Sequence, residues 1–353
     1  MVFDAKRPTS QHEEERFPFC VVDHFLSDLT QLTLLSAAFD LGLVELLEKR
    51  APLSVAQIRE QLDLDRRTHR LFIDGLVGMD VLREVEAGLT LTDRFRRALE
   101  YRDLMDVTIE LGMMSARDVV SGLPTLVRDR RRYLEEAGLF RFFHYVPGES
   151  WTEDELEDTR RWVSAISTLT RYESQIVLAA HDFRKYRRVL DVGGNSGELV
   201  RQICGAIHQI EGTVIDLPIV CEVGRRMTEG HAAQERIRFV GTDVREQSFP
   251  AGQDLVVFKS VLHDWDKSVA QRLIERARAC LAPGGCVMVV EKRPVDFRGH
   301  DRWSDRLMWF PYYAWRRAPQ RYARMMEQAG LTDVRIDADL PRELSIVTAQ
   351  REG

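Results

Sequence analysis

Hydrophobic positions recur at helical spacing from Val21 onwards, and they predict a mainly helical first part of the chain. Between Val21 and Leu41 the chain has more leucine, alanine and phenylalanine residues than one core-facing stripe of a helix requires. This excess favours a helix buried against a second copy of the chain, and a fully buried core helix explains it equally well. The polar residues 1–17 before it predict a mobile arm.

A helix–helix–hairpin pattern follows. Ser54 is a suitable N-cap for a short helix, and a second helix is predicted over residues 66–79. Residues 81–85 and 88–92 then have the character of two strands joined by a tight turn. This order is that of a winged helix, so residues 18–100 are predicted to form a winged-helix-like domain.

A winged helix raises the hypothesis of DNA binding. Arg66, Arg67 and Arg70 stand at the start of the helix that would read the DNA. Residues 51–100, however, hold eight arginines against nine aspartates and glutamates, a net charge of −1. A DNA reader needs a basic face to neutralise phosphates. A scaffold role is therefore favoured, with a DNA-binding regulator as the alternative from another functional class.

Residues 101–180 have a helical pattern without a sharp motif. Met113, Met114 and several aromatic residues supply soft or planar side chains that suit either a pocket or an ordinary core. We expect this part to be a helical linker that contributes to an acceptor pocket.

After residue 185, short apolar strands alternate with helical stretches. The strands are predicted at 189–192, 213–215, 238–240, 254–258 and 286–290. Such alternation is typical of a parallel sheet with right-handed crossovers. Residues 181–353 are therefore predicted to form a doubly wound α/β domain.

Composition restricts the class of protein further. The 353 residues are 44% hydrophobic and 30% charged, with a net charge of −6, which excludes a disordered, collagen-like or disulfide-stapled chain. The N-terminus lacks a signal-peptide core, no apolar run approaches the ~20 residues that span a bilayer, and the five cysteines form no CxxC pair. These features predict a cytoplasmic protein that binds neither nucleic acid nor membrane. The histidines show no metal-ligand spacing.

The first predicted strand of the α/β domain ends in a glycine-rich turn. Such a turn lets a ligand approach the backbone and the following helix N-terminus. Neither GxGxxG nor a phosphate loop with GK[ST] fits it. Asp216 ends the second strand, nineteen residues after the turn, where such sheets bind a ribose diol. A nucleoside without a pyrophosphate is the predicted ligand. The turn consists of Asp191, Val192, Gly193, Gly194, Asn195, Ser196 and Gly197.

Two further strand ends carry polar residues. Asp243 and Val244 close the third strand, and the fourth strand runs into His263, Asp264 and Trp265. Side chains at the carboxyl ends of parallel strands reach the crevice where ligands bind. A lone histidine is usually structural, but its place beside Asp264 and Trp265 favours a general base.

Five segments in this order resemble the small-molecule O-methyltransferases that use S-adenosylmethionine: LDVGGNSG, IDLP, GTDV, FKSVLHDWD and LAPGGCVMVVEKRPVD. That family includes plant caffeate-type enzymes and bacterial enzymes of antibiotic and pigment biosynthesis. The resemblance covers most of residues 20–350. It implies a Rossmann-like doubly wound methyltransferase domain preceded by a mainly helical winged-helix dimerisation domain, and hence a homodimer.

The resemblance also implies roles for the cofactor residues. Gly193 and its neighbours would hold the methionine portion of S-adenosylmethionine, and Asp216, with Leu217 beside it, would bind the ribose hydroxyls. Asp243 and Val244 would frame the adenine, with Lys259 near the same end. S-adenosylhomocysteine would be the product.

His263 matches the family's catalytic base, and Glu291, just after the fifth strand, matches a carboxylate that orients it. Because the cofactor provides the electrophile, the protein must align the acceptor and remove its proton. An imidazole of pKa ~6.5 suits a phenol of pKa ~10, and Glu291 would stabilise the imidazolium. We therefore predict methylation of a hydroxyl on a small aromatic acceptor. Carbon or nitrogen methylation, and a non-methylating decarboxylase, hydroxylase or pericyclase that keeps the cofactor, are the alternatives.

One position departs from the family pattern. A second glutamate usually stands in a GGKER-like segment, and a gap-free count places Arg316 there. Either the count is off, or His263 is held by Glu291 and Asp264 alone, or the chemistry has changed. An acceptor carboxylate paired with Arg316 or Arg317 is a further hypothesis. The aromatic stretch before Arg316 is expected to line the acceptor pocket, a core or a dimer surface. The stretch consists of Trp303, Trp309, Phe310, Tyr312, Tyr313 and Trp315. The candidate acceptor contacts are Tyr313 from this stretch, Met113, Met114, Trp265 and Arg316.

Overall fold

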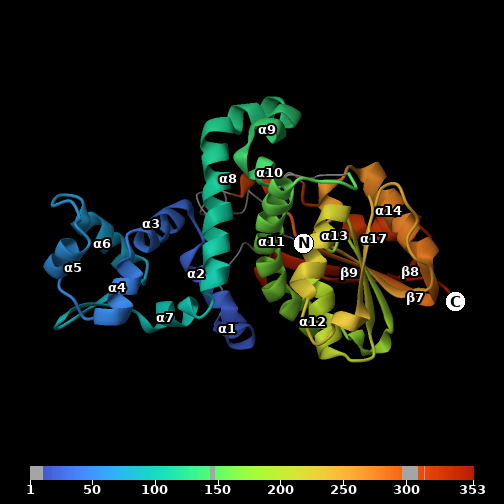
Figure 1. Cartoon of the computed structure of the whole chain (residues 1–353), viewed down its shortest axis with the longest axis horizontal. Coiled ribbons are helices and arrows are strands. Elements are labelled where there is room, and N and C mark those ends of the chain that lie inside the picture. Colours follow the sequence, from blue (N-terminus) through green and yellow to red (C-terminus); the bar gives the residue numbers. More distant parts are fainter. Residues whose placement is uncertain (1–10, 144–147, 296–308, 314) are drawn as a thin grey trace. The chain divides into compact units, whose positions relative to one another are not determined.

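The computed structural model describes residues 11–143, 148–295, 309–313 and 315–353, in two compact units (Figure 1). The first unit comprises Met1–Leu139 and Asp296–Pro311, and the second comprises Phe140–Val295 and Tyr312–Gly353. The second unit therefore begins well before residue 181, where the sequence predicts the start of the α/β domain. The described residues between 140 and 180 belong by their contacts to the sheet-bearing unit.

The described part of the first unit is mainly helical, as the hydrophobic spacing predicts. A two-stranded hairpin is its sheet element, formed by β1 (Leu82–Val85) and β2 (Gly88–Leu91). Its helices are α1 (Gln11–Arg16), α2 (Val22–Phe25), α3 (Leu29–Asp40), α4 (Leu43–Arg50), α5 (Val55–Gln61), α6 (His69–Gly78), α7 (Asp93–Leu99), α8 (Arg102–Arg128) and α9 (Arg130–Glu136); α10 (Gly138–Phe142) crosses into the second unit.

The two helices and the hairpin expected after Ser54 form at the predicted places. Ser54 caps α5 through a reciprocal capping box with Gln57. Gly88, at a φ of 135°, closes the hairpin, and a Cβ there would lie 2.5 Å from the backbone of Leu53. Leu53 pairs with Leu89, which joins the hairpin to the chain before α5. The assignment of these elements to a winged helix stays a prediction.

The expected N-terminal arm has a helix in its described part. Gln11–Arg16 form α1, and Phe17 is buried. Residues 1–10 lie outside the described residues.

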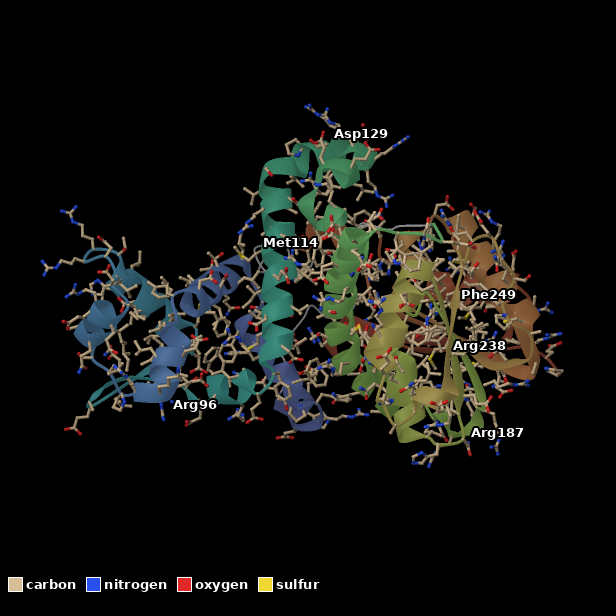
Figure 2. The ribbon with its side chains drawn as sticks, in the orientation of Figure 1. Arg96, Met114, Asp129, Arg187, Arg238 and Phe249 are labelled. Atoms are coloured by element: carbon tan, nitrogen blue, oxygen red, sulfur yellow. The ribbon has the colours of Figure 1, made fainter. Side chains whose placement is uncertain are left out.

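Helix α3 packs against the long helix α8. Asp129, at the end of α8, caps α9 by accepting a hydrogen bond of 3.1 Å from the backbone N–H of Arg132 (Figure 2). The dense apolar positions of α3 include Leu32 and Leu35, both fully buried within this chain.

The second unit contains a seven-stranded sheet. Its order is β5-β4-β3-β6-β7-β9-β8, with β3 to β7 parallel and β9 antiparallel to both β7 and β8. The five predicted strands are confirmed; the two C-terminal strands and their antiparallel pairing are additions that make the sheet mixed. The strands are β3 (Arg188–Val192), β4 (Glu211–Asp216), β5 (Ile237–Gly241), β6 (Gln253–Lys259), β7 (Leu281–Lys292), β8 (Thr332–Asp337) and β9 (Leu344–Gln350).

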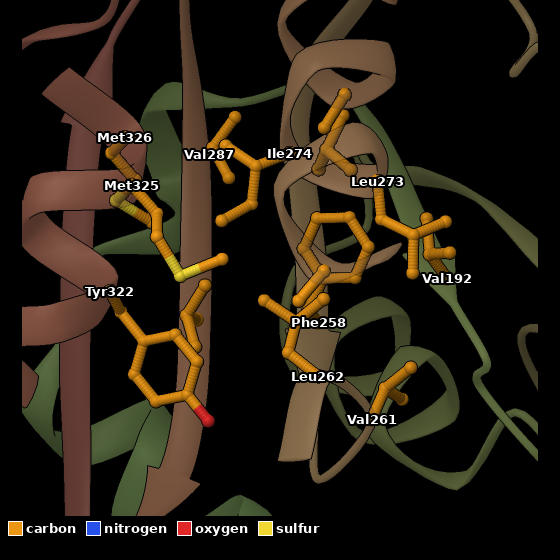
Figure 3. Packing of buried hydrophobic residues seen from close by; sticks show 14 of the residues in the cluster. Val192, Phe258, Val261, Leu262, Leu273, Ile274, Val287, Tyr322, Met325 and Met326 are labelled. Atoms are coloured by element: carbon orange, nitrogen blue, oxygen red, sulfur yellow. The ribbon is translucent and has the colours of Figure 1, made fainter. Parts of the chain in front are cut away.

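Helices cover both faces of this sheet, as a doubly wound fold requires (Figure 1). On one face, Tyr322, Met325 and Met326 of α17 pack with Phe258 and Val287 into a continuous core (Figure 3). The helices of this unit are α11 (Glu153–Ala180), α12 (Glu198–Ala206), α13 (Pro218–Thr228), α14 (Lys267–Cys280), α16 (Phe310–Tyr313), which begins in the first unit, and α17 (Pro319–Gln328).

Three whole-chain features bear on function. Within the described ranges, no single helix has the length and apolar content to cross a bilayer. Helices α3 and α4 reach that length and apolar content only when counted as one segment, and a bend of 64° separates them. All five cysteines are buried and free of disulfides. Among the described residues, no group of three or more His, Cys, Asp or Glu side chains is arranged to hold a metal ion.

Candidate active site

The glycine-rich turn between β3 and α12 depends on residues that tolerate unusual backbone angles. Gly193, Asn195 and Gly197 have φ values of 69°, 54° and 73°. A Cβ on Gly194 would lie 2.8 Å from the carboxylate of Asp191. The turn is thus drawn tightly over the strand end, and it leaves backbone rather than side chains facing outwards. Such a surface admits a ligand at close range.

Asp216, at the end of β4, holds this turn in place. Its two carboxylate oxygens accept hydrogen bonds from the backbone N–H groups of Asn195 and Leu217, both at 2.8 Å. Burial raises the pKa of Asp216 to about 6, although the two backbone bonds oppose the shift. Each carboxylate oxygen keeps one lone pair for a hydroxyl donor. The predicted role of Asp216 in binding a diol fits this geometry.

Asp191 is a buried carboxylate with one unused oxygen. It is 2% exposed, and its Oδ1 atom has no hydrogen-bond partner among the described residues. Burial raises the pKa of Asp191 to about 7; Lys259 opposes the shift and Asp216 adds to it. A buried polar atom without a partner calls for an explanation. A cationic or hydrogen-bonding ligand group at the turn would supply that partner.

Asp243 and Trp265 come together through one arginine. The guanidinium of Arg245 forms a two-pronged ion pair with Asp243, the shortest contact being 2.5 Å, and lies 4.9 Å from the ring centroid of Trp265. Val244 is buried beside them. The end of β5 and the loop after β6, separate in the sequence, therefore meet at one place. Arg245 belongs to this group although the sequence did not single it out.

Lys259, at the end of β6, faces a helix that the motifs did not include. Its Nζ atom lies 2.6 Å from Glu173 of α11 and 3.4 Å from the hydroxyl of Thr170. Lys292, at the end of β7, also contacts Glu173, at 3.3 Å. Burial opposes the ionisation of Glu173, but the two lysines outweigh it and lower the pKa of that carboxyl. Helix α11 is thus tied to two strand ends of the site.

A second link joins α11 to the glycine turn. The hydroxyl groups of Ser167 and Ser196 lie 2.5 Å apart, and Ser167 donates to the carbonyl of Val163. Because a serine has one proton to donate, Ser196 is the donor to Ser167. Neither Ser167 nor Glu173 stands in a recognisable motif. Their helical spacing is the only signal in the sequence, and it does not distinguish them from ordinary core positions.

His263 and Glu291 form the pair that the family resemblance implies. Glu291, at the end of β7, is 3% exposed, and its Oε2 atom lies 2.6 Å from Nδ1 of His263. Its Oε1 atom accepts hydrogen bonds from the backbone N–H groups of Val261 and His263, both at 3.2 Å. The glutamate therefore fixes both the ring and the backbone of the histidine. It leaves Nε2 as the ring nitrogen facing away from Glu291.

Asp264 occupies the other side of the ring. Its Oδ1 atom lies 3.2 Å from Nε2, and its side chain is half exposed. Burial disfavours the charged imidazole, but Glu291 and Asp264 outweigh it and raise the pKa of His263 to about 9, while Arg316 acts in the opposite direction. The histidine is thus held in its protonated form at neutral pH. Moving Asp264 away from Nε2 would free the nitrogen and lower the pKa.

Arg316 and Arg317 have different partners. Arg316 donates to Glu343, at 2.7 Å, and to the carbonyl of Arg293, at 3.2 Å. Arg317 donates to the carbonyls of Leu262 and Trp265. Among the described residues, no carboxylate takes the place of the family glutamate expected at Arg316, and the charge of Arg316 lowers the pKa of His263. Both guanidinium groups thus have partners within this unit.

The other residues predicted to contact the acceptor lie in different parts of the chain. Met113 and Met114 lie on α8 in the first unit, and their part in the acceptor site stays a prediction. The side chain of Tyr313 and the whole of Trp303 lie outside the described residues. From the aromatic stretch, Trp315 packs edge-on against Phe140, with ring centroids 5.1 Å apart.

The second unit is therefore an α/β domain with a glycine-rich turn and two acidic side chains at the carboxyl ends of β3 and β4, and a histidine after β6 that contacts a buried glutamate. The family model of the O-methyltransferase domain matches residues 124–332. The chain belongs to this O-methyltransferase family.

Individual relatives agree with this placement. The chain is 32% identical over 125 residues to 3-hydroxy-5-methyl-1-naphthoate 3-O-methyltransferase of Streptomyces sahachiroi, a match covering 35% of each protein. It is 27% identical to acetylserotonin O-methyltransferase of Bos taurus, over 85% of this chain and 89% of that protein. The matches with the first three relatives span 35% to 54% of those proteins' length.

Solved structures show the same fold. Human N-acetylserotonin methyltransferase in complex with SAM superposes with a TM-score of 0.70 at 20% identity, and the alignment covers the whole of both chains. This likeness extends over both units of the chain, so the helical first unit is part of the shared architecture.

Proposed function

We propose that this protein transfers a methyl group from S-adenosylmethionine to a hydroxyl group of a small aromatic metabolite, with His263 as the general base. The observation that carries the proposal is the Glu291–His263 contact at the same sheet edge as Asp191 and Asp216. A base and a nucleoside-type pocket at one edge are what methyl transfer to a hydroxyl requires.

The residues at the pocket fit the cofactor. The glycine turn packs closely on the strand ends, because Cβ atoms on Gly193 and Gly194 would meet Val261 and Asp191. Asp216 has lone pairs for two ribose hydroxyls, and Asp191 offers an ammonium group a carboxylate oxygen that has no partner among the described residues. Asp243, Val244 and Lys259 complete the site in this proposal. When bound, S-adenosylmethionine supplies an activated methyl group.

The protein's own task is then to hold and deprotonate the acceptor. An acceptor hydroxyl that takes the place of Asp264 at Nε2 removes one of the two carboxylates that raise the pKa of His263. As its pKa falls, the imidazolium releases its Nε2 proton to solvent. The neutral imidazole then accepts the hydroxyl proton at Nε2, and Glu291 stabilises the resulting imidazolium through Nδ1. Asp264 thus controls access to the base, and Glu291 supports its charge.

The acceptor class follows from chemistry near the base. The aromatic side chains around Trp315 suit a planar ring, whereas the ring of Trp265 lies against Arg245 beside Asp243. The naphthoate named for the Streptomyces sahachiroi relative carries both a hydroxyl and a carboxylate. An aromatic hydroxy acid is therefore the first acceptor to test. Arg316 is the candidate partner for its carboxylate, in exchange for Glu343.

The oligomeric state belongs to the same proposal. Val120 and Val127, one heptad apart on α8, are 70% and 73% exposed. An apolar stripe of this kind favours a second copy of the chain as its cover, and we expect a homodimer by light scattering. A monomer at micromolar concentration would contradict this part alone.

Calorimetry with S-adenosylmethionine and S-adenosylhomocysteine tests the cofactor, and binding of neither would end the proposal. Mass spectrometry of a panel of phenols, aryl acids and amines tests the transfer, comparing wild type with His263→Ala. We expect a mass gain of one methylene on an aromatic hydroxyl. Fragmentation that places the methyl group on nitrogen or carbon would replace the O-methyl assignment. Binding of S-adenosylmethionine without any methylated product would favour a non-methylating reaction.

A further inference from the structure

The turn that carries His263 has few backbone hydrogen bonds of its own. After Ser260, at a φ of 56°, the chain makes a single 3₁₀ turn over Leu262–Asp264. Within it, Asp264 N–H donates to Val261 and Trp265 N–H donates to Leu262 at a long 3.4 Å. Such a short turn leaves backbone donors and acceptors at both ends unsatisfied. Other groups must satisfy them if the imidazole is to stay in one place.

Two charged side chains do so from opposite sides. Glu291 accepts from the N–H groups of Val261 and His263. Arg317 donates from Nη1 to the carbonyl of Leu262, at 2.5 Å, and from Nη2 to the carbonyl of Trp265. The carboxylate therefore satisfies the donors of the turn and the guanidinium satisfies its acceptors. The two carbonyls that Arg317 bridges are the ones immediately before His263 and immediately after Asp264.

An arginine is required for this bridge. The guanidinium presents donors in a rigid planar fork, and hydrogen bonds from a charged donor are about twice as strong as neutral ones. A lysine ammonium at the same place reaches one carbonyl well but does not reproduce the fork. Arg317 also stands close enough to Asp264 for its charge to oppose the effect of burial, which raises the pKa of that carboxyl.

The position of Arg317 is itself secured by packing. Two residues later, Pro319 begins α17, and Tyr322 and Met326 of that helix are completely buried against the sheet (Figure 3). Because α17 is anchored in the core, the arginine before it has a fixed origin. The bridge thus connects the core of the unit with the turn of the base.

We propose that Arg317 is a positioning residue, which holds the turn Leu262–Trp265 so that the imidazole of His263 faces the acceptor hydroxyl. It acts through the backbone and not on the acceptor or the cofactor. The inference rests on the proposed function of His263, but the geometry of the turn is testable without methyl transfer.

The experiment compares Arg317→Ala and Arg317→Lys with wild type. For Arg317→Ala we expect kcat to fall about 100-fold, because small misplacement of a catalytic group has effects of that size. KM for the acceptor and the calorimetric Kd for S-adenosylhomocysteine should stay within about twofold, since the cofactor turn is untouched. Arg317→Lys should retain an intermediate kcat, and millimolar guanidinium chloride should restore part of the rate of Arg317→Ala. Arg324→Ala, an exposed arginine on α17, is the matched control and should behave as wild type.

A second measurement needs no turnover. NMR titration of the His263 imidazole, assigned with His263→Gln, should show a pKa near 9 in wild type and a value closer to 6.5 in Arg317→Ala, because a relaxed turn weakens the contact with Glu291. The charged groups that face the ring are Glu291, Asp264 and Arg316, and all three remain in the variant. An unchanged imidazole pKa, or an unchanged kcat, would overturn the inference. If the imidazole pKa falls in Arg317→Ala as expected but the wild type transfers no methyl group, the proposed function would be overturned and the positioning of the His263 turn by Arg317 would stand.

Discussion

The turns after β3 and β6 lie at the same edge of one sheet, and each contains a non-glycine residue with positive φ, Asn195 and Ser260. The two turns differ in what satisfies their polar groups. The turn after β3 leaves Oδ1 of Asp191 buried without a partner among the described residues, whereas backbone donors and acceptors of the turn after β6 are satisfied by Glu291 and Arg317.

The difference corresponds to two tasks. A site that binds a charged ligand gains affinity when the ligand, and not the protein, satisfies its buried polar groups. A site that positions a base needs its backbone fixed before the acceptor arrives. The first turn therefore keeps an unsatisfied carboxylate oxygen where a ligand is expected. In the second turn the backbone is held by Glu291 and Arg317, and Nε2 of His263 faces the half-exposed Asp264.

The largest effect should come from the base itself. His263→Ala is expected to lower kcat by about 10²- to 10⁴-fold, the usual contribution of a general base. The calorimetric Kd for S-adenosylhomocysteine should not change. Mass spectrometry of the methylated product provides the rate. Wild-type turnover in the variant would show that the turn after β6 does not carry the base and would remove the contrast between the two turns.

Asp191→Asn tests the turn after β3, where we expect a loss of cofactor binding and not of protein stability. We expect cofactor affinity to fall about 10- to 100-fold, because a hydrogen bond to a charged group contributes about 1.5–3 kcal/mol. The Tm of the protein without cofactor should rise or stay unchanged, since an unpaired buried carboxylate is replaced by a neutral amide. Glu198→Gln is the control, because Glu198 is already paired with Arg201 and its replacement should lower Tm. A lower Tm for Asp191→Asn would mean that the carboxylate has a structural partner.

The pH profile sharpens the assignment of the base. With the pKa of His263 raised to about 9, kcat/KM should increase with pH up to that value, because the imidazole must be neutral to accept a proton. The raised pKa stabilises the fold below pH 6.5, and this contribution is lost as the pH rises through 9. Glu291→Gln should move the rising limb to lower pH and reduce its plateau about tenfold. A rising limb unchanged by Glu291→Gln would show that another group titrates.

Cofactor affinity should depend on pH at the other turn. The pKa values of Asp191 and Asp216 are raised to about 7 and 6, so both carboxylates protonate on mild acidification. Because a neutral carboxyl binds a cation poorly, calorimetry should show affinity for S-adenosylmethionine about tenfold weaker at pH 5.5 than at pH 8. Asp191→Asn should flatten this dependence. Equal affinity at both pH values would assign the ligand's charged groups to other residues.

The smallest effect is expected on α11. Ser167→Ala leaves the buried hydroxyl of Ser196 without its acceptor, and should reduce the free energy of unfolding by about 1–3 kcal/mol. Denaturant titration measures this loss. Cofactor Kd should rise only a few fold, because the glycine turn keeps its contacts with Asp216. An unaffected stability would indicate that Ser196 finds another partner.

Much of the sheet and half of the site were predictable because their signals are local. The apolar strands, the glycines and the strand-end aspartates lie within short stretches of sequence, and the helical capping at Ser54 has the same character. The antiparallel strands β8 and β9 were not predicted, because β8 is exposed at most positions and lacks a buried-strand pattern.

The chain's sequence by itself determined the α/β class, the glycine turn with Asp216, and the pairing of His263 with Glu291 through family resemblance. Only the tertiary structure decided that an oxygen of Asp191 has no partner among the described residues, that Glu173 of α11 meets Lys259 and Lys292, and that Arg317 bridges the turn of His263. The physical reason is distance along the chain. A glycine or an alternating strand shows its role through its neighbours in sequence, whereas the partner of a buried charge is chosen by packing among residues far apart.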